Sequence, residues 1–235
     1  FKGLNLTLET LDGLIKHNGP IKNLNLFDKI LNKKIFKNKI NFNNYPSLEA
    51  QAASISDDIA YNNHDLEDGL RAALFDLDNL KSIPLLSKII DSHKKKINNF
   101  RKEIIINQII REIINLMVLD VIRTTNINLK KIKPRSIKDI YSNRQFIVDF
   151  SDEMKKNIKL IKTFLKKNMY NHKQVLVNTN NGKKIVRNLF HYFVNNPKKY
   201  MGDKLFKNKP TERAISDFIA GMTDRYAINI YDKIK

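Results

Sequence analysis

Residues 85–119 read LLSKIIDSHKKKINNFRKEIIINQIIREIINLMVL. Apolar side chains recur in this stretch at intervals of three or four positions, and that spacing brings side chains to one face of an α-helix. The apolar stripe consists of Ile89, Ile90, Ile97, Ile104, Ile105, Ile109, Ile113, Ile114 and Met117. We therefore predict a long amphipathic helix over roughly Leu85–Leu119, with its apolar face in the core or at a subunit interface.

The same periodicity extends over most of the chain. Further helices are expected around Leu8–Ile15, from Ser47 to about Asn63, over Asp65–Leu77, from Ser151 to about Tyr170, over Val186–Val194, and from about Thr211 to the C-terminus. Asn18-Gly19-Pro20 is expected to end the first of these helices. Two short apolar runs, Phe146–Phe150 and Gln174–Val177, are candidates for extended segments. The sequence therefore predicts an all-α protein.

Composition excludes several classes of protein. The chain has 235 residues and no cysteine, which excludes disulfides, thiolate zinc sites and cysteine nucleophiles. Charged or amide residues interrupt every apolar run well before the roughly 18 residues of a membrane-spanning helix. Because no signal peptide is evident either, we expect a cytoplasmic protein. The first residue is Phe1 rather than Met, so we also expect this sequence to be a piece of a longer chain.

The net charge of +19 has two interpretations. A basic surface attracts the phosphates of nucleic acids. However, 34 Lys, 30 Asn and 32 Ile make up 96 of the 235 residues, and all three have codons rich in A and T. A biased genome would enrich them without any phosphate partner. Nucleic acid therefore remains a possible partner that charge alone does not establish.

One window departs sharply from this basic character. Residues 41–70 contain no Lys or Arg but carry six acids, Glu49, Asp57, Asp58, Asp65, Glu67 and Asp68. Clustered carboxylates repel one another and raise one another's pKa values unless a cation or hydrogen bonds offset the repulsion. The window therefore draws attention as a candidate site.

Asp57, Tyr61 and Asp65 are spaced four residues apart in this window. On a continuous helix they fall within an arc of about 80°. A carboxylate is a hard oxygen ligand for a divalent metal, and a tyrosine can stack on a sugar or base while its hydroxyl forms a hydrogen bond. A solvated acidic helix face is the alternative interpretation, and spacing alone does not separate the two.

Residues 48–65, LEAQAASISDDIAYNNHD, resemble a block of the bacterial deoxyguanosine triphosphate triphosphohydrolases (dGTPases) and dGTPase-like proteins of the HD-domain superfamily. Further blocks agree in the same order: Gly3–Thr7 with Gly13–Pro20, Met169–His172 with Ile185–Phe190, and Ile219–Ala227. The resemblance covers the chain from end to end. It implies a multi-helical HD-type bundle, with the C-terminal part of the catalytic core in residues 1–80 and a helical C-terminal region in residues 81–235.

The resemblance also implies an activity. Enzymes of this family use one divalent metal to hydrolyse a dNTP to deoxynucleoside and triphosphate. Here the metal is expected to be Mg²⁺ or Mn²⁺, with another transition metal as the alternative. dGTP is the favoured substrate by resemblance, and homo-oligomers are common. Asp57 matches the last metal ligand of the family, and Tyr61 and Asp65 match the residues that contact deoxyribose. Asp224 and Arg225 are weaker candidates that support the substrate pocket, with a structural ion pair as the alternative.

The sequence departs from the family pattern at its start. The family's first metal-binding His, its His-Asp pair and its catalytic loop precede the block that matches Gly3–Thr7. The catalytic residues are therefore expected upstream of residue 1, and the chain alone is expected to be incomplete for catalysis. The alternative is a non-catalytic helical module that binds nucleic acid or nucleotide.

Overall fold

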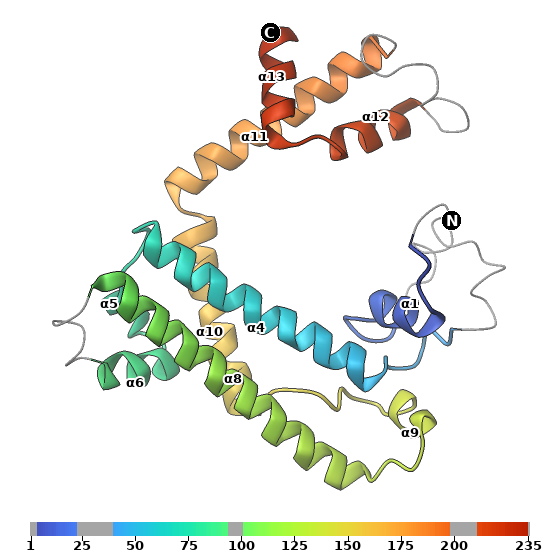
Figure 1. Ribbon diagram of the computed structural model, residues 1–235, viewed down its shortest axis with the longest axis vertical. Coiled ribbons are helices and arrows are strands. Elements are labelled where there is room, and N and C mark those ends of the chain that lie inside the picture. Colours follow the sequence, from blue (N-terminus) through green and yellow to red (C-terminus); the bar gives the residue numbers. More distant parts are fainter. Residues whose placement is uncertain (1–3, 23–39, 94–100, 198–210, 235) are drawn as a thin grey trace. The chain divides into compact units, whose positions relative to one another are not determined.

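The structure is a computed structural model that describes residues 4–22, 40–93, 101–197 and 211–234. In these ranges every regular element is a helix, so the predicted all-α class is confirmed. In chain order the elements are α1 (Leu8–Ile15), α4 (Leu48–Arg71), α5 (Leu77–Leu80), α6 (Pro84–Ser92), α8 (Lys102–Ile132), α9 (Ile137–Tyr141), α10 (Asp152–Leu165), the π-helical turn η1 (Lys166–Tyr170), α11 (Lys173–Asn195), α12 (Thr211–Ala220) and α13 (Asp224–Ile234) (Figure 1).

The chain divides into two compact units, residues 1–168 and residues 169–235. The sequence predicts a boundary at residue 80, between a catalytic core and a C-terminal region. Residue 80 lies inside the first of the two units. That functional division stays a prediction. Within the described ranges, no helix combines the length and apolarity needed to cross a bilayer.

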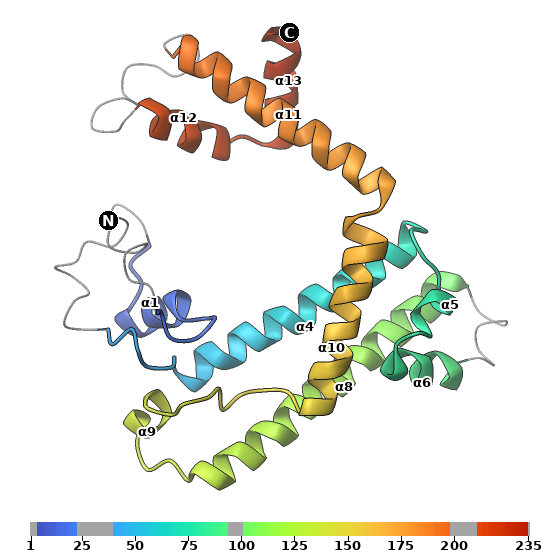
Figure 2. The ribbon, with the colours of Figure 1, turned by 180° about the vertical axis from the view of Figure 1, so that it is seen from behind.

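The first unit is built around α4 and α8, which pack side by side (Figures 1 and 2). Helices α1 and α10 also contact α4, and α6 contacts α8. The core is formed by fully buried aliphatic side chains, among them Leu66, Leu70, Ile105, Ile109, Ile113, Met117, Ile161 and Leu165. Burial of this apolar surface is the main source of stability for the pair, at about 25 cal/mol per Å².

The helix predicted over Leu85–Leu119 is interrupted. Helix α6 ends at Ser92, where the Ser92 hydroxyl donates to the Ile89 carbonyl at 2.7 Å and Nδ1 of His93 lies 3.0 Å from the same oxygen. Both side chains therefore compete for a carbonyl oxygen that would accept a backbone hydrogen bond if the helix continued. Helix α8 then begins at Lys102 and extends to Ile132, beyond the predicted end.

The predicted apolar stripe is correct in part. Ile89, Ile90, Ile105, Ile109, Ile113 and Met117 are buried. Ile104 is 43% exposed, whereas Ile106 and Ile110, which were not assigned to the stripe, are buried. Ile114 is half-buried, and Ile97 lies outside the described residues. Because several isoleucines follow one another directly, the apolar pattern alone does not tell which of them lie on the buried face of the helix.

Other predicted boundaries also change. Residues 48–71 form one helix rather than two, because His64 and Asp65 continue α4. The predicted C-terminal helix is two helices, since Gly221, Met222 and Thr223 separate α12 from α13. The run Gln174–Val177 is helical, within α11, and the run Phe146–Phe150 is neither helix nor strand. The predicted stop at Asn18–Pro20 is confirmed, and Gly19 there has a φ of 100°.

In the described part of the second unit, α11, α12 and α13 form a cluster of helices. Helix α11 contacts both α12 and α13, and the core of the cluster consists of Ile185, Leu189, Phe193, Ile215 and Ile230. The blocks Ile185–Phe190 and Ile219–Ala227, which carry part of the family resemblance, thus contribute to the small apolar core of this unit.

Candidate functional site

The candidate site lies on α4, whose N-terminus is capped by Ser47. The Ser47 side chain accepts a hydrogen bond from the Ala50 amide at 3.3 Å. Because α4 continues without interruption to Arg71, Asp57, Tyr61 and Asp65 occupy successive turns of one face. Asp57 is exposed, Tyr61 is 57% exposed, and Asp65 is half-buried. The structure therefore brings the three predicted residues into one row.

Other positions around α4 are buried, and three of them carry side-chain amides: Gln51, Asn62 and Asn63. Gln51 is 2% exposed, and its Oε1 accepts hydrogen bonds from the amides of Ile147 at 2.8 Å and Val148 at 3.1 Å. Its Nε2 donates to the Pro46 carbonyl at 2.9 Å. Gln51 therefore holds the backbone of Ile147 and Val148 against α4. The sequence analysis did not single out Gln51. The sequence hints at its role only by placing one amide side chain among alanines.

Helix α1 ends against the N-terminal part of α4. A Cβ atom on Gly13 would lie 2.8 Å from Cβ of Ala50, so this approach requires glycine. The Ser54 hydroxyl donates to the carbonyl of His17 at 3.1 Å. The turn after α1 is therefore held about one helical turn before Asp57. In α1 itself, the buried Lys16 forms an ion pair with Asp12 and serves the fold.

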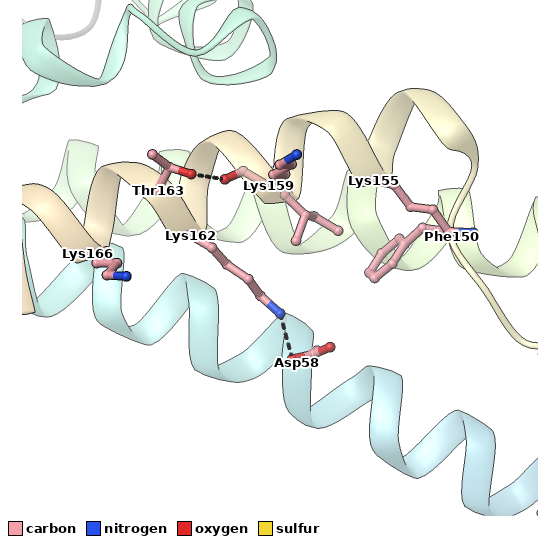
Figure 3. Close-up of a pocket in the computed structure, with 8 residues that line it drawn as sticks. Asp58, Phe150, Lys155, Lys159, Lys162, Thr163 and Lys166 are labelled. Carbon is pink, nitrogen blue, oxygen red and sulfur yellow. Dashed lines mark hydrogen bonds and ion pairs between the residues drawn. The ribbon is translucent and has the colours of Figure 1, made fainter. Parts of the chain in front are cut away.

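Asp58 has a different environment from its neighbour Asp57. A one-residue step rotates the side chain by about 100° around the helix, and Asp58 meets α10. Nζ of Lys162 lies 3.1 Å from Oδ1 of Asp58 (Figure 3). The two adjacent carboxylates therefore point to different surroundings, and Asp58 has a cationic partner in the structure.

The described residues do not contain a complete metal site. No group of three or more His, Asp or Glu side chains among them is arranged to hold a metal ion. The exposed carboxylate of Asp57 is a hard oxygen donor and is able to supply one ligand. A divalent cation needs several such donors, so residues outside the described ranges would have to provide the others.

The weaker candidates Asp224 and Arg225 begin α13 in the second unit, and both are exposed. The Thr223 hydroxyl accepts a hydrogen bond from the Tyr226 amide at 3.3 Å at the start of this helix. A carboxylate in the first turn, as at Asp224, interacts favourably with the helix dipole. The role of Asp224 and Arg225 in supporting a substrate pocket stays a prediction.

Comparison with known proteins connects these features to a family. Residues 148–233 match the family described as phosphohydrolase-associated domain. A deoxyguanosinetriphosphate triphosphohydrolase-like protein of Pelagibacter ubique is 55% identical over 230 residues, which cover 98% of this chain. Proteins of the same name from Bartonella tribocorum and Parvibaculum lavamentivorans are 38% and 34% identical over the whole chain.

The chain is similar to dGTPase-like proteins along its whole length. The expected family resemblance is thereby confirmed. The chain spans 62% of the length of the Pelagibacter relative and 61% of the other two. The phosphohydrolase-associated match includes α10, α11, α12 and α13 up to residue 233, whereas Asp57, Tyr61 and Asp65 lie before it.

Proposed function

We propose that this dGTPase-like chain supplies part of the active site of a metal-dependent triphosphohydrolase. The reaction converts a deoxynucleoside triphosphate and water into a deoxynucleoside and triphosphate, with dGTP as the favoured substrate. The observation that carries the proposal is the row of Asp57, Tyr61 and Asp65 on the outer face of α4. The names of the relatives support the reaction class.

In the proposed site, Asp57 contributes one oxygen ligand to Mg²⁺ or Mn²⁺. Such an ion, when bound, acidifies water and neutralises phosphate charge. Asp57 suits this role because its carboxylate is exposed, and because its neighbour Asp58 is the one that pairs with Lys162. The remaining ligands come, in this proposal, from the part of the protein that the chain does not span.

Tyr61 and Asp65 bind the sugar in this proposal. The Tyr61 ring is 57% exposed and offers a flat apolar surface for the deoxyribose. A ring packed under C2′ leaves no room for a 2′-hydroxyl and so disfavours ribonucleotides. One turn further on, the Asp65 carboxylate is placed to accept a hydrogen bond from a sugar hydroxyl.

The test uses complementation. The part of the Pelagibacter ubique relative outside its match to this chain is produced separately and mixed with the 235-residue chain in Mn²⁺ or Mg²⁺. Release of triphosphate is expected from the mixture and not from the chain alone. Tyr61→Ala should lower turnover of dNTPs and reduce discrimination against NTPs, while Tyr61→Phe, which keeps the ring, should retain both. Robust metal-dependent release from the chain alone would contradict the proposal.

A non-catalytic module that binds nucleic acid or nucleotide is the second candidate function. The net charge of +19 favours it. A tight, salt-sensitive complex with DNA, together with no triphosphate release in the complementation assay, would support the module over the enzyme.

A further inference from the structure

An apolar groove extends the outer face of α4 from Asp57 toward the N-terminus of the helix. Helix α1 packs against this part of α4 (Figures 1 and 2). Ala53 and Ala50 line the groove and precede Asp57 by four and seven residues. This spacing places both alanines within about 40° of Asp57 around the helix axis. The groove and the candidate metal ligand therefore lie on the same side of α4.

Contacts already present in the chain set the shape of this groove, which has a volume of about 410 Å³. Its two helices meet at Gly13 and Ala50, where a Cβ atom on the glycine would lie 2.8 Å from Cβ of the alanine. The hydrogen bond from the Ser54 hydroxyl to the His17 carbonyl holds the turn after α1. The groove is therefore formed before anything binds in it.

The lining of the groove combines exposed apolar side chains with acidic ones. Leu14 on α1 is 59% exposed, and Ala53 on α4 is exposed as well. The charged residues of the lining that have no cationic form are Glu9 and Glu49, and no Lys or Arg from the described ranges lines the groove. A matching partner presents apolar side chains to Leu14 and Ala53, with a Lys or Arg beside them to meet the carboxylates.

Two observations identify a source for such a partner. More than a third of the length of the relatives from Pelagibacter ubique and Bartonella tribocorum lies outside their match to this chain. The same part of the protein supplies, in the proposed function, the ligands that join Asp57 around the metal. Those ligands have to reach the outer face of α4 beside Asp57, and the groove occupies this face directly before Asp57.

We propose that the counterpart of this additional part of the relatives docks in the groove between α1 and α4, through an apolar segment flanked by a basic residue. The proposal rests on the proposed function for the position of the missing metal ligands. A second copy of the chain would bury the same side chains, so the test includes the oligomeric state.

The test introduces cysteine, which this chain lacks. Leu14→Cys and Ala53→Cys place a thiol in the groove, and Val177→Cys, at a position that is 61% exposed in the second unit, is the matched control. Each variant is made in the 235-residue chain and in a full-length chain, in which the 235 residues replace the matching part of the Pelagibacter relative. Alkylation by iodoacetamide is followed by mass spectrometry. In the full-length chain it should slow at least about tenfold at both groove positions and less than about twofold at residue 177.

Thiol protection and hydrolase activity are separate outcomes. Protection of both groove positions in a full-length chain that releases no triphosphate would support the docking site and contradict the proposed function. Release of triphosphate with both positions still open to alkylation would contradict the docking site alone.

The unmodified chains provide a measurement that does not depend on any substitution. Hydrogen exchange of the amides in α1 and residues 48–57 should be slower in the full-length chain than in the 235-residue chain. Unchanged exchange there, or equal thiol protection at residue 177, would overturn the proposal. So would thiol protection in the 235-residue chain that rises with its concentration together with dimer formation in sedimentation, because that result would assign the groove to a second copy.

Discussion

The two faces of α4 differ in almost every physical property. On the inner face, Leu66 is fully buried and Gln51 is 2% exposed, whereas Tyr61 on the outer face is 57% exposed. The inner face is held by apolar contacts and by the hydrogen bonds of Gln51, and the outer face presents acids and a phenol to its surroundings. One helix of 24 residues thus separates what stabilises the fold from what is available to bind a ligand.

The largest expected effect on stability comes from the apolar part of the inner face. Leu66→Ala should lower the free energy of unfolding by about 2–5 kcal/mol, because it removes a fully buried side chain and leaves a cavity. Tyr61→Ala on the outer face should change it by less than about 0.5 kcal/mol. Urea denaturation followed by circular dichroism measures both. Similar losses in the two variants would remove the distinction between the faces.

The next effect concerns the polar part of the inner face. Gln51→Ala leaves the amides of Ile147 and Val148 without their acceptor and should cost about 2–3 kcal/mol. Ser56→Ala, at an exposed position of the same helix, is the control and should be nearly neutral. If Gln51→Ala were equally neutral, the amide would not be what holds the backbone of Ile147 and Val148 against α4.

Two glycine substitutions sharpen the comparison by changing stability in opposite directions. A Cβ atom on Gly69 would lie 2.2 Å from the Phe75 ring, so Gly69→Ala should cost about 1–3 kcal/mol through overpacking. A Cβ atom on Gly182 in α11 would meet nothing within 4 Å. Gly182→Ala should therefore stabilise its helix by up to about 1 kcal/mol. In thermal denaturation, a neutral or stabilised Gly69→Ala variant would contradict the close packing at Gly69, and a destabilised Gly182→Ala variant would contradict the open surroundings of Gly182.

The smallest effect is electrostatic, at the start of α4. Hydrogen bonds from its own backbone N–H and from the Ser47 hydroxyl lower the pKa of Glu49. A carboxyl group whose pKa is lower in the folded than in the unfolded state stabilises the protein at pH values above its unfolded-state pKa. This contribution to the free energy of unfolding is lost as pH falls through the folded-state pKa. Because Glu49 is exposed, Glu49→Gln should cost only about 0.3 kcal/mol at pH 7. The difference should shrink and then vanish as pH falls through the lowered pKa, and urea denaturation at pH 7 and at successively lower pH values measures it.

Much of the helical framework follows from the sequence, because periodic apolar residues and capping signals are local. Ser151 caps α10 as predicted, with its side chain accepting from the Met154 amide. The break at Ser92 was missed because it depends on side chains competing for a backbone carbonyl, which leaves no periodic signal.

The candidate site was predictable only in part, for the same reason. Helical periodicity predicts that Asp57, Tyr61 and Asp65 share a face, but it does not tell which face the core covers. The contact between Asp58 and Lys162 joins residues 104 positions apart, so no local pattern predicts it. Gln51 likewise acts on residues nearly a hundred positions away.

The most direct test of the account compares the two adjacent carboxylates of α4. Mn²⁺ affinity is measured by calorimetry in the complemented protein, for Asp57→Ala and for Asp58→Ala. We expect Asp57→Ala to weaken Mn²⁺ binding by at least about 100-fold, because a direct ligand is lost. Asp58→Ala should weaken it by less than about threefold, since Asp58 is paired with Lys162. Equal loss in the two variants, or full retention in Asp57→Ala, would contradict it.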